Sequence, residues 1–293
     1  MLHWTSAGAV AMPEMVQIRL SQRFSARVTA GAPVPTRTMT SEEFRAECHH
    51  FTIARRGPRT QPCHTLLLSG MPFEQADLAA VVADRALYGW RRVVVHLDRG
   101  QRQTFLQSAA FSAVDGVSLP VVTEPDLADL AAIRRAAKDV TAIVVLDTLG
   151  LSQLERTTAL LEVARPQKVV LSWPFPSPES DPPPSADQVA PRLKDVVERL
   201  QAVGIGVGIK GLPACRLGSL HPLVWRSANR WYVDVDHRGD RALLFFPEVV
   251  RFVHPDECRF CAINHRCDGV PEAWWRIGRA GVLRAIESDT VAE

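Results

Sequence analysis

From residue 16 to residue 211 the chain alternates short apolar, β-branched runs with longer amphipathic stretches, and this alternation restricts its fold more than any other feature. Strands are expected at 16–20, 65–69, 92–97, 117–122, 142–146, 168–173 and 205–210, and helices at 74–87, 125–138, 152–164 and 186–203. Parallel strands need crossovers of this length, so the pattern predicts an α/β protein with a parallel sheet. Repeated units of about 25 to 30 residues favour a partial (β/α)6-type barrel over a short open sheet.

The alternation ends after Gly211, and the remaining residues follow a different pattern. Residues 230–246 predict a hairpin that turns at Arg238-Gly239-Asp240. We therefore expect two domains, a partial barrel over 1–211 and a small cysteine-rich module over 212–293. The proline-rich stretch 174–185 cannot continue a helix or a central strand, so it is expected to be a loop at the carboxyl end of a strand.

Charge and hydropathy exclude several classes of function. The 293 residues carry 34 Lys and Arg against 32 Asp and Glu, which leaves no basic excess for binding a nucleic acid. No apolar run has the length of a membrane span, and no targeting segment is recognisable at the start, so a soluble cytoplasmic protein is expected. Motifs of serine hydrolases, P-loop enzymes and His-Glu-x-x-His metalloproteases are absent from the sequence.

Four of the six cysteines form a pattern typical of a metal site. Cys258, Cys261 and Cys267 have the spacing C-x2-C-x5-C, and Cys215 precedes them by about forty residues, after a Leu-Pro turn. Four thiolates suit either zinc or an iron–sulfur cluster, and the spacing alone does not separate the two. The alternative without a metal is a small apolar module that contains reduced cysteines.

The segments around these cysteines resemble the C-terminal auxiliary-cluster region of radical S-adenosylmethionine (SAM) proteins, and the resemblance extends over most of the chain. They read Leu-Pro-Ala-Cys at 212–215, Cys-Arg-Phe-Cys at 258–261 and Cys-Asp-Gly-Val-Pro at 267–271. The resemblance implies a partial barrel followed by an auxiliary [4Fe-4S] cluster. Its ligands by matching are Cys215, Cys258, Cys261 and Cys267.

The chain departs from this family at the site where SAM is cleaved. Family members carry C-x3-C-x2-C just after the first strand, whereas Phe24, Val28 and Gly31 occupy those positions here. The Gly-Gly-Glu-Pro turn that follows the second strand in the family is replaced by Ser-Gly-Met-Pro at 69–72. The resemblance therefore implies a degenerate member that neither binds nor cleaves SAM and has no catalytic residues of its own.

The function implied is that of a partner subunit. The chain would bind one auxiliary cluster and pair as a heterodimer with an intact radical SAM enzyme, in the modification of a peptide or a small-molecule natural product. Two alternatives remain open. In one, the chain is itself an enzyme that uses the cluster, or recruits SAM in another manner. In the other, it is a zinc-stabilised binding module.

The remaining motifs have simpler interpretations. Cys48 and Cys63, with their neighbouring histidines, suggest a second metal site, but a buried thiol and surface imidazoles account for them equally well. Gly206 to Gly211 match G-x-G-x-x-G inside a strand, which favours close backbone approach over dinucleotide binding. The acidic residues of the hairpin are expected to form a solvated face. Tryptophans are expected to cover the cluster, namely Trp225, Trp231, Trp274 and Trp275.

Overall fold

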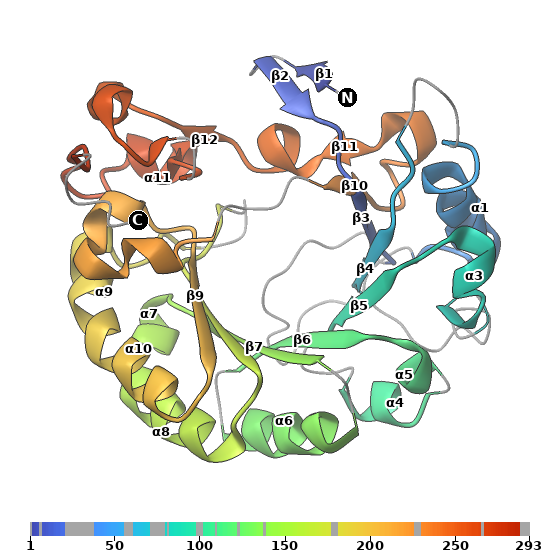
Figure 1. The fold of residues 1–293 in the computed structure, drawn as a ribbon, viewed down its shortest axis with the longest axis horizontal. Helices are drawn as coiled ribbons and strands as arrows, with labels where there is room; N and C mark the ends of the chain where they lie inside the picture. Colours follow the sequence, from blue (N-terminus) through green and yellow to red (C-terminus); the bar gives the residue numbers. More distant parts are fainter. Residues whose placement is uncertain are drawn as a thin grey trace. The chain divides into compact units, whose positions relative to one another are not determined.

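The chain is a mixed α/β protein with a large, mostly parallel sheet (Figure 1). The computed structural model describes residues 2–5, 8–20, 38–55, 61–70, 80, 82–97, 102–108, 110–121, 124–136, 139–176, 181–225, 230–264 and 267–287. Two compact units divide the chain. Unit 1 comprises 1–119, 132–140 and 229–249, and unit 2 comprises 120–131, 141–228 and 250–293.

Unit 1 holds the first strands of the sheet, in the order β11-β10-β3-β4-β5-β6. The strands are β3 (Met15–Arg19), β4 (Thr65–Ser69), β5 (Arg92–His96), β6 (Gly116–Pro120), β10 (Trp231–Val233) and β11 (Leu243–Leu244). The helices are α1 (Ser41–Phe51), α3 (Arg85–Tyr88), α4 (Arg102–Leu106), α5 (Ala110–Ala113), η5 (Gly239–Arg241) and η6 (Phe245–Val249). A separate hairpin pairs β1 (Leu2–Thr5) with β2 (Gly8–Ala11).

The core of unit 1 lies between the sheet and its helices. Alternate strand residues are almost fully buried, namely Val16, Ile18, Leu66, Leu68, Val93, Val95, Val117 and Leu119. Successive side chains of a strand point to opposite faces, so these residues form one apolar face. In Figure 1 the helices α1, α3, α4 and α5 lie along one side of β3 to β6. They bring Phe44, Phe51 and Phe105 into the core, and all three are buried.

Unit 2 holds the strands β7 (Asp139–Val145), β8 (Lys168–Ser172) and β9 (Gly206–Lys210), which are parallel and in that order. The first residues of β7 and the last of α6 (Glu124–Ala136) belong to unit 1. The other helices of this part are α7 (Thr148–Ser152), α8 (Leu154–Ala164), α9 (Ala186–Val189), η2 (Ala190–Arg192) and α10 (Leu193–Ala202). Leu193, Val196, Val197 and Leu200 recur at helical spacing on α10 and are buried.

The C-terminal part of unit 2 is built from short elements. They are η3 (Ala214–Arg216), η4 (Gly218–Leu223), β12 (Phe252–Val253), η7 (Asp256–Phe260), β13 (Val270–Pro271) and α11 (Glu272–Arg276). Strands β12 and β13 pair antiparallel, with Phe252 opposite Pro271 and Val253 opposite Val270. This pairing closes a loop that contains three of the four candidate cysteines.

The seven strands predicted from the alternation are all present, and their ends shift by no more than three residues. The largest shift is in β7, which begins at Asp139 where the sequence predicted Ala142. Half of the helix predicted at 74–87 lies outside the described residues. Helix α1 was not predicted, although Thr40 and Glu43 form a capping box at its start.

The predicted hairpin is present as β10 and β11, and it also joins the sheet of unit 1. β10 pairs antiparallel with β11 and parallel with β3, where Tyr232 lies opposite Gln17. Parallel pairing between segments more than two hundred residues apart leaves no local pattern in a sequence. Among the described helices, none combines the length and the apolar character that a membrane span requires.

Candidate metal centre

Cys215 follows β9 at a turn that only glycine can form without strain. Gly211 has φ +86°, and a Cβ at this position would lie 2.7 Å from the carbonyl oxygen of Trp173. The turn leads through Leu212 and Pro213 into η3, on which Cys215 lies. The end of β9 thus fixes the position of the first candidate ligand.

Cys258, Cys261 and Cys267 lie on successive tight turns between β12 and β13. The backbone N–H of Cys258 donates to Pro255 at 2.8 Å, that of Cys261 donates to Cys258 at 3.2 Å, and that of Cys267 donates to Ile263 at 3.1 Å. Gly269 then closes the loop at φ +86°, where a Cβ would lie 2.3 Å from the carbonyl oxygen of Val253. These turns hold the three cysteines within one short segment.

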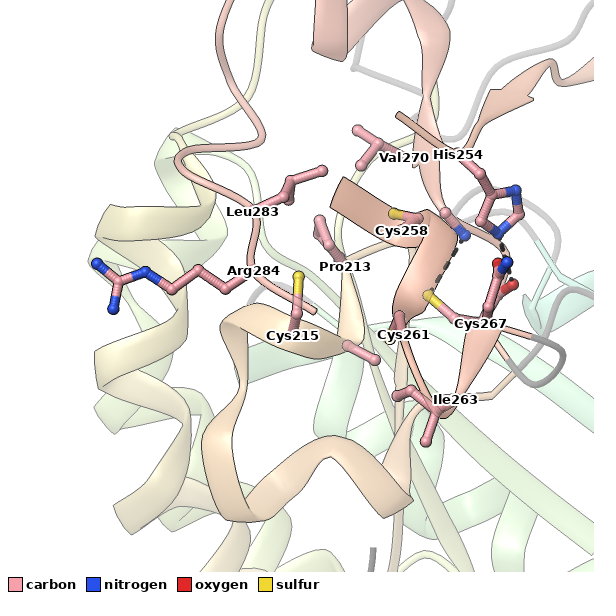
Figure 2. A pocket seen from close by; sticks show the side chains of 13 residues that line it. Pro213, Cys215, His254, Cys258, Cys261, Ile263, Cys267, Val270, Leu283 and Arg284 are labelled. Carbon is pink, nitrogen blue, oxygen red and sulfur yellow. Dashed lines mark hydrogen bonds between the residues drawn. The ribbon is translucent and has the colours of Figure 1, made fainter. Parts of the chain in front are cut away.

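All four candidate cysteines line one pocket in unit 2 (Figure 2). The pocket has an atom-free volume of about 340 Å³, open mouth included, and most of the surface it exposes is apolar. Its other lining residues include Pro213, His254, Ile263, Val270, Leu283 and Arg284. Cys215 and Cys267, which are 52 residues apart in the sequence, therefore line the same cavity.

Backbone N–H groups point at two of the sulfur atoms. The N–H of Gly269 donates to Cys267 Sγ at 3.3 Å, and the N–H of Ile286 donates to Cys261 Sγ at 3.5 Å. The segment 283–286 thus lies against the pocket, since Leu283 and Arg284 also line it. This segment contains no cysteine or histidine, so no motif in the sequence pointed to it.

The thiols are held in surroundings that disfavour a free negative charge. Burial raises the pKa of Cys215 and Cys267, and burial together with the neighbouring cysteines raises the pKa of Cys258 to about 11. A bound cation reverses this preference, since it stabilises thiolates that would otherwise repel one another.

The donor set of the pocket fits an iron–sulfur cluster. Four cysteine sulfurs are the ligand set such clusters use, and N–H donors to those sulfurs are a recognised means of adjusting their potential. A single tetrahedral zinc ion would require sulfurs only about 3.8 Å apart. Over the described residues, no group of three or more His, Cys, Asp or Glu side chains is arranged to hold a metal ion, so the positions of the thiols do not separate zinc from a cluster.

Aromatic side chains cover only part of this region. Trp275 packs with Cys215 and Cys258 against Val270 and Leu283, and Trp274 is buried and donates to the carbonyl of Pro174 at 2.7 Å. Trp225 instead stacks on Gly208 of β9, with Lys168 Nζ 3.4 Å from its ring centre. Trp231 lies on β10 in unit 1. Neither Trp225 nor Trp231 is among the residues that line the pocket.

The remaining motifs have structural roles. Cys48 and Cys63 are buried in unit 1, where burial raises the pKa of Cys48 and raises that of Cys63 to about 12. Gly208 allows the close approach of Trp225 that the glycine motif predicted. Asp234 is buried and not solvated, and hydrogen bonds from the backbone N–H groups of Asp236 and His237 to its carboxylate offset the loss of water. Phe24, Val28 and Gly31 lie outside the described residues.

No protein-family model matches the chain, and a search of curated proteins finds no match either. Solved structures do match it. The crystal structure of Streptococcus suis SuiB bound to S-adenosylmethionine aligns over 95% of this chain and 77% of that chain, with a TM-score of 0.57 and 8% sequence identity. The chain shares the fold of SuiB.

Two further crystal structures of SuiB match with a TM-score of 0.50. The structure bound to the precursor peptide SuiA aligns over 72% of this chain at 8% identity, and that of SuiB without a stated ligand aligns over 69% at 7% identity. In these alignments the chain spans about half the length of SuiB. At such identity the likeness concerns the fold alone.

Proposed function

We propose that the chain is a radical-SAM-like subunit that binds one auxiliary [4Fe-4S] cluster and pairs with an intact radical SAM enzyme in peptide modification. In this proposal the parallel strands form a partial (β/α)6-type barrel, and residues 212–293 contribute the cluster module. The cluster ligands are Cys215, Cys258, Cys261 and Cys267. The chain would act in the cytoplasm, where thiols remain reduced and available as ligands.

One observation carries this proposal: four cysteines from separate segments line a single pocket. A bound iron–sulfur cluster would supply an electron-accepting or Lewis-acidic centre there. The protein's own contribution would be to exclude water with Val270 and Leu283 and to donate N–H hydrogen bonds to Cys261 and Cys267. Such donors stabilise the more reduced, more negative state of a cluster.

The residues at 24, 28 and 31 are the reason for proposing that the chain acts as the partner of another enzyme. Phe24, Val28 and Gly31 have no side-chain group that binds iron, so the chain would need another protein to supply SAM cleavage. SuiB, which shares the fold, has been crystallised with a precursor peptide, and this supports a peptide as the substrate class. The chain would then present the peptide, relay electrons or stabilise the partner.

Anaerobic reconstitution with iron and sulfide tests the cluster. The proposal predicts about four irons and four sulfides per chain and a broad absorption band near 400 nm, consistent with a four-thiolate cluster. Cys261→Ser should remove most of the bound iron, whereas Cys63→Ala, which removes a buried thiol outside the pocket, should leave the iron content unchanged. A colourless protein with stoichiometric zinc would contradict the proposal and favour a zinc-stabilised module.

The absence of SAM cleavage is a separate prediction. The purified, reconstituted chain, supplied with dithionite and SAM, should produce no 5′-deoxyadenosine above the background of a protein-free control. A purified complex of the chain with an intact radical SAM enzyme should produce it. Sustained turnover by the isolated chain would show that it is itself an enzyme.

A further inference from the structure

The last residues that the structure describes lie against the cysteine pocket and form neither helix nor strand. Leu283 lines the pocket and is buried against Val270, beside Cys215. Arg284 also lines it, but its side chain is exposed and points away from the cysteines in Figure 2. Arg284 therefore faces the pocket with its backbone. We call residues 281–286 the C-terminal strap.

Arg216, the residue after Cys215, holds the first half of the strap. Its guanidinium donates through Nη1 to the carbonyl oxygen of Val282 at 2.5 Å, and through Nη2 to the carboxylate of Asp187 on α9. This carboxylate lies against the backbone of Gly281, where a Cβ would stand 2.5 Å from Asp187 Oδ2. The absence of a side chain at Gly281 therefore lets the Arg216–Asp187 pair pack against the strap.

The second half of the strap is tied to Cys261 and its neighbour. The backbone N–H of Ile286 donates to Cys261 Sγ at 3.5 Å, and the carbonyl of Ile286 accepts from the N–H of Ala262 at 2.9 Å. The backbone of Arg284 contacts the other ligand segment: burial raises the pKa of Cys215, and a hydrogen bond from the Arg284 backbone opposes this rise. The strap thus contacts two candidate ligands.

The two segments that the strap joins are distant in the sequence. Cys215 follows β9, whereas Cys261 lies in the loop between β12 and β13. A metal centre bound by four cysteines requires both segments to keep fixed positions. Loss of the groups that support metal ligands typically lowers metal affinity by about 10- to 100-fold.

We propose that the C-terminal strap positions Cys215 against Cys261, and that Arg216 and Asp187 are the positioning residues that hold the strap. The presence of a metal centre in the pocket rests on the proposed function, whereas the contacts of the strap join groups of the chain itself. The strap therefore shields the Cys215 thiol in the metal-free protein and slows metal release from the loaded protein.

Alkylation of the metal-free full chain with iodoacetamide tests the strap, with the modification of each cysteine followed by mass spectrometry of peptides. Gly281→Ala should bring a methyl group against Asp187 and open the strap. Gly278→Ala is the matched control, because φ is +71° at Gly278 and +70° at Gly281, but a Cβ at Gly278 would meet nothing within 4 Å. Both variants carry the strain of a positive φ, so their comparison isolates the contact with Asp187.

Cys215 should be alkylated at least about tenfold faster in Gly281→Ala than in Gly278→Ala. The thiolate is the reacting form, and burial is the main cause of the raised pKa of Cys215. Opening the strap therefore increases both the access of the reagent and the thiolate fraction. Cys63, which is buried in unit 1, reports the global fold and should stay equally protected in both variants.

Arg216→Lys is a second test that leaves the backbone of the strap unchanged. A lysine keeps the charge but loses the planar fork that contacts Val282 and Asp187 together. The alkylation of Cys215 should become about tenfold faster, whereas Arg276→Lys, which changes an exposed arginine of α11, should leave it unchanged. If Gly281→Ala also exposes Cys63, the comparison of these two lysine variants decides.

Iron release separates this proposal from the proposed function. After anaerobic reconstitution, a ferrous chelator should remove iron about tenfold faster from Gly281→Ala than from Gly278→Ala. A wild-type chain that takes up no metal would contradict the proposed function, and the alkylation rates would still decide the role of the strap. Equal alkylation of Cys215 in the two alanine variants, with Cys63 protected in both, would overturn the strap proposal.

Discussion

Single residues decide whether the cysteine pocket can form. The candidate side chains could be predicted from the sequence, because cysteines clustered at this spacing are typical metal ligands. The N–H donors of Gly269 and Ile286 could not be predicted from the sequence. Almost every residue has a backbone N–H, and only the folded path of the chain decides which sulfur it points at. Nor could the pairing of Gln17 with Arg230, which are more than two hundred residues apart. Residues whose role depends on their own side-chain chemistry could be predicted from the sequence. Contacts between residues far apart in the sequence could not.

The turn before Cys215 gives a prediction at this scale. Gly211→Ala should lower the free energy of unfolding by more than Gly204→Ala, although both glycines have similar positive φ, +86° and +81°. A Cβ at Gly211 would lie 2.7 Å from a backbone oxygen, while a Cβ at Gly204 would meet nothing within 4 Å. We expect a loss of about 1 kcal/mol from strain alone at Gly204 and at least about 2 kcal/mol at Gly211.

Urea unfolding, followed by circular dichroism, measures both losses. Since Gly211 leads into η3, the Gly211→Ala variant should also retain less iron after reconstitution, whereas Gly204→Ala should retain as much as the wild type. Equal destabilisation by the two substitutions would show that the contact with Trp173 does not constrain this turn.

Secondary-structure elements were the most predictable part of the molecule. The strands from β3 to β9 were predicted because each is a short apolar run flanked by polar residues or turns. Parallel strands that are largely covered on both faces have this pattern, as the consecutive buried residues of β3 and β8 show. Helix α1 was not predicted, although Thr40 and Glu43, which form its capping box, have the spacing of that motif in the sequence. The parallel pairing of β10 with β3 could not be predicted, because nothing in either strand specifies its neighbour.

The packing of α10 on α8 gives a prediction about elements. Arg199 of α10 donates to Glu162 of α8 at 2.8 and 2.9 Å and to Glu155 at 2.8 Å. Arg199→Ala should lower the free energy of unfolding by about 0.5–1 kcal/mol at low salt and neutral pH, and by less at high salt. Lys194→Ala, on the same helix, breaks only an exposed pair 3.9 Å long and should change stability by less than about 0.5 kcal/mol.

The contribution of Arg199 should depend on pH in a defined direction. The hydrogen bond from Arg199 lowers the pKa of Glu162 below its ordinary value of 4.5. A carboxylate with a lowered pKa in the folded protein stabilises it above the unfolded-state pKa, and this contribution is lost as pH falls through the folded value. The difference between wild type and Arg199→Ala should therefore shrink below about pH 4.5. A difference that stays constant from pH 7 to pH 3 would show that the pair does not act through charge.

At the scale of the whole molecule, the C-terminal cysteine segments and the segment after the first parallel strand differ in whether they carry residues that can bind iron. The four cysteines of the C-terminal pocket suit an iron–sulfur cluster, and the positions that would hold a SAM-cleaving cluster carry Phe24, Val28 and Gly31. The α/β class could be predicted because its pattern repeats along the chain. The division into units could not, because residues 229–249 belong with the N-terminal strands.

Anomalous X-ray diffraction at the iron edge, on crystals of the anaerobically reconstituted chain, tests the proposed cluster most directly. We predict one strong iron peak per chain, inside the pocket formed by Cys215, Cys258, Cys261 and Cys267, with all four sulfurs bound to iron. No iron peak in this pocket, or an iron peak beside Phe24, would contradict the proposed function.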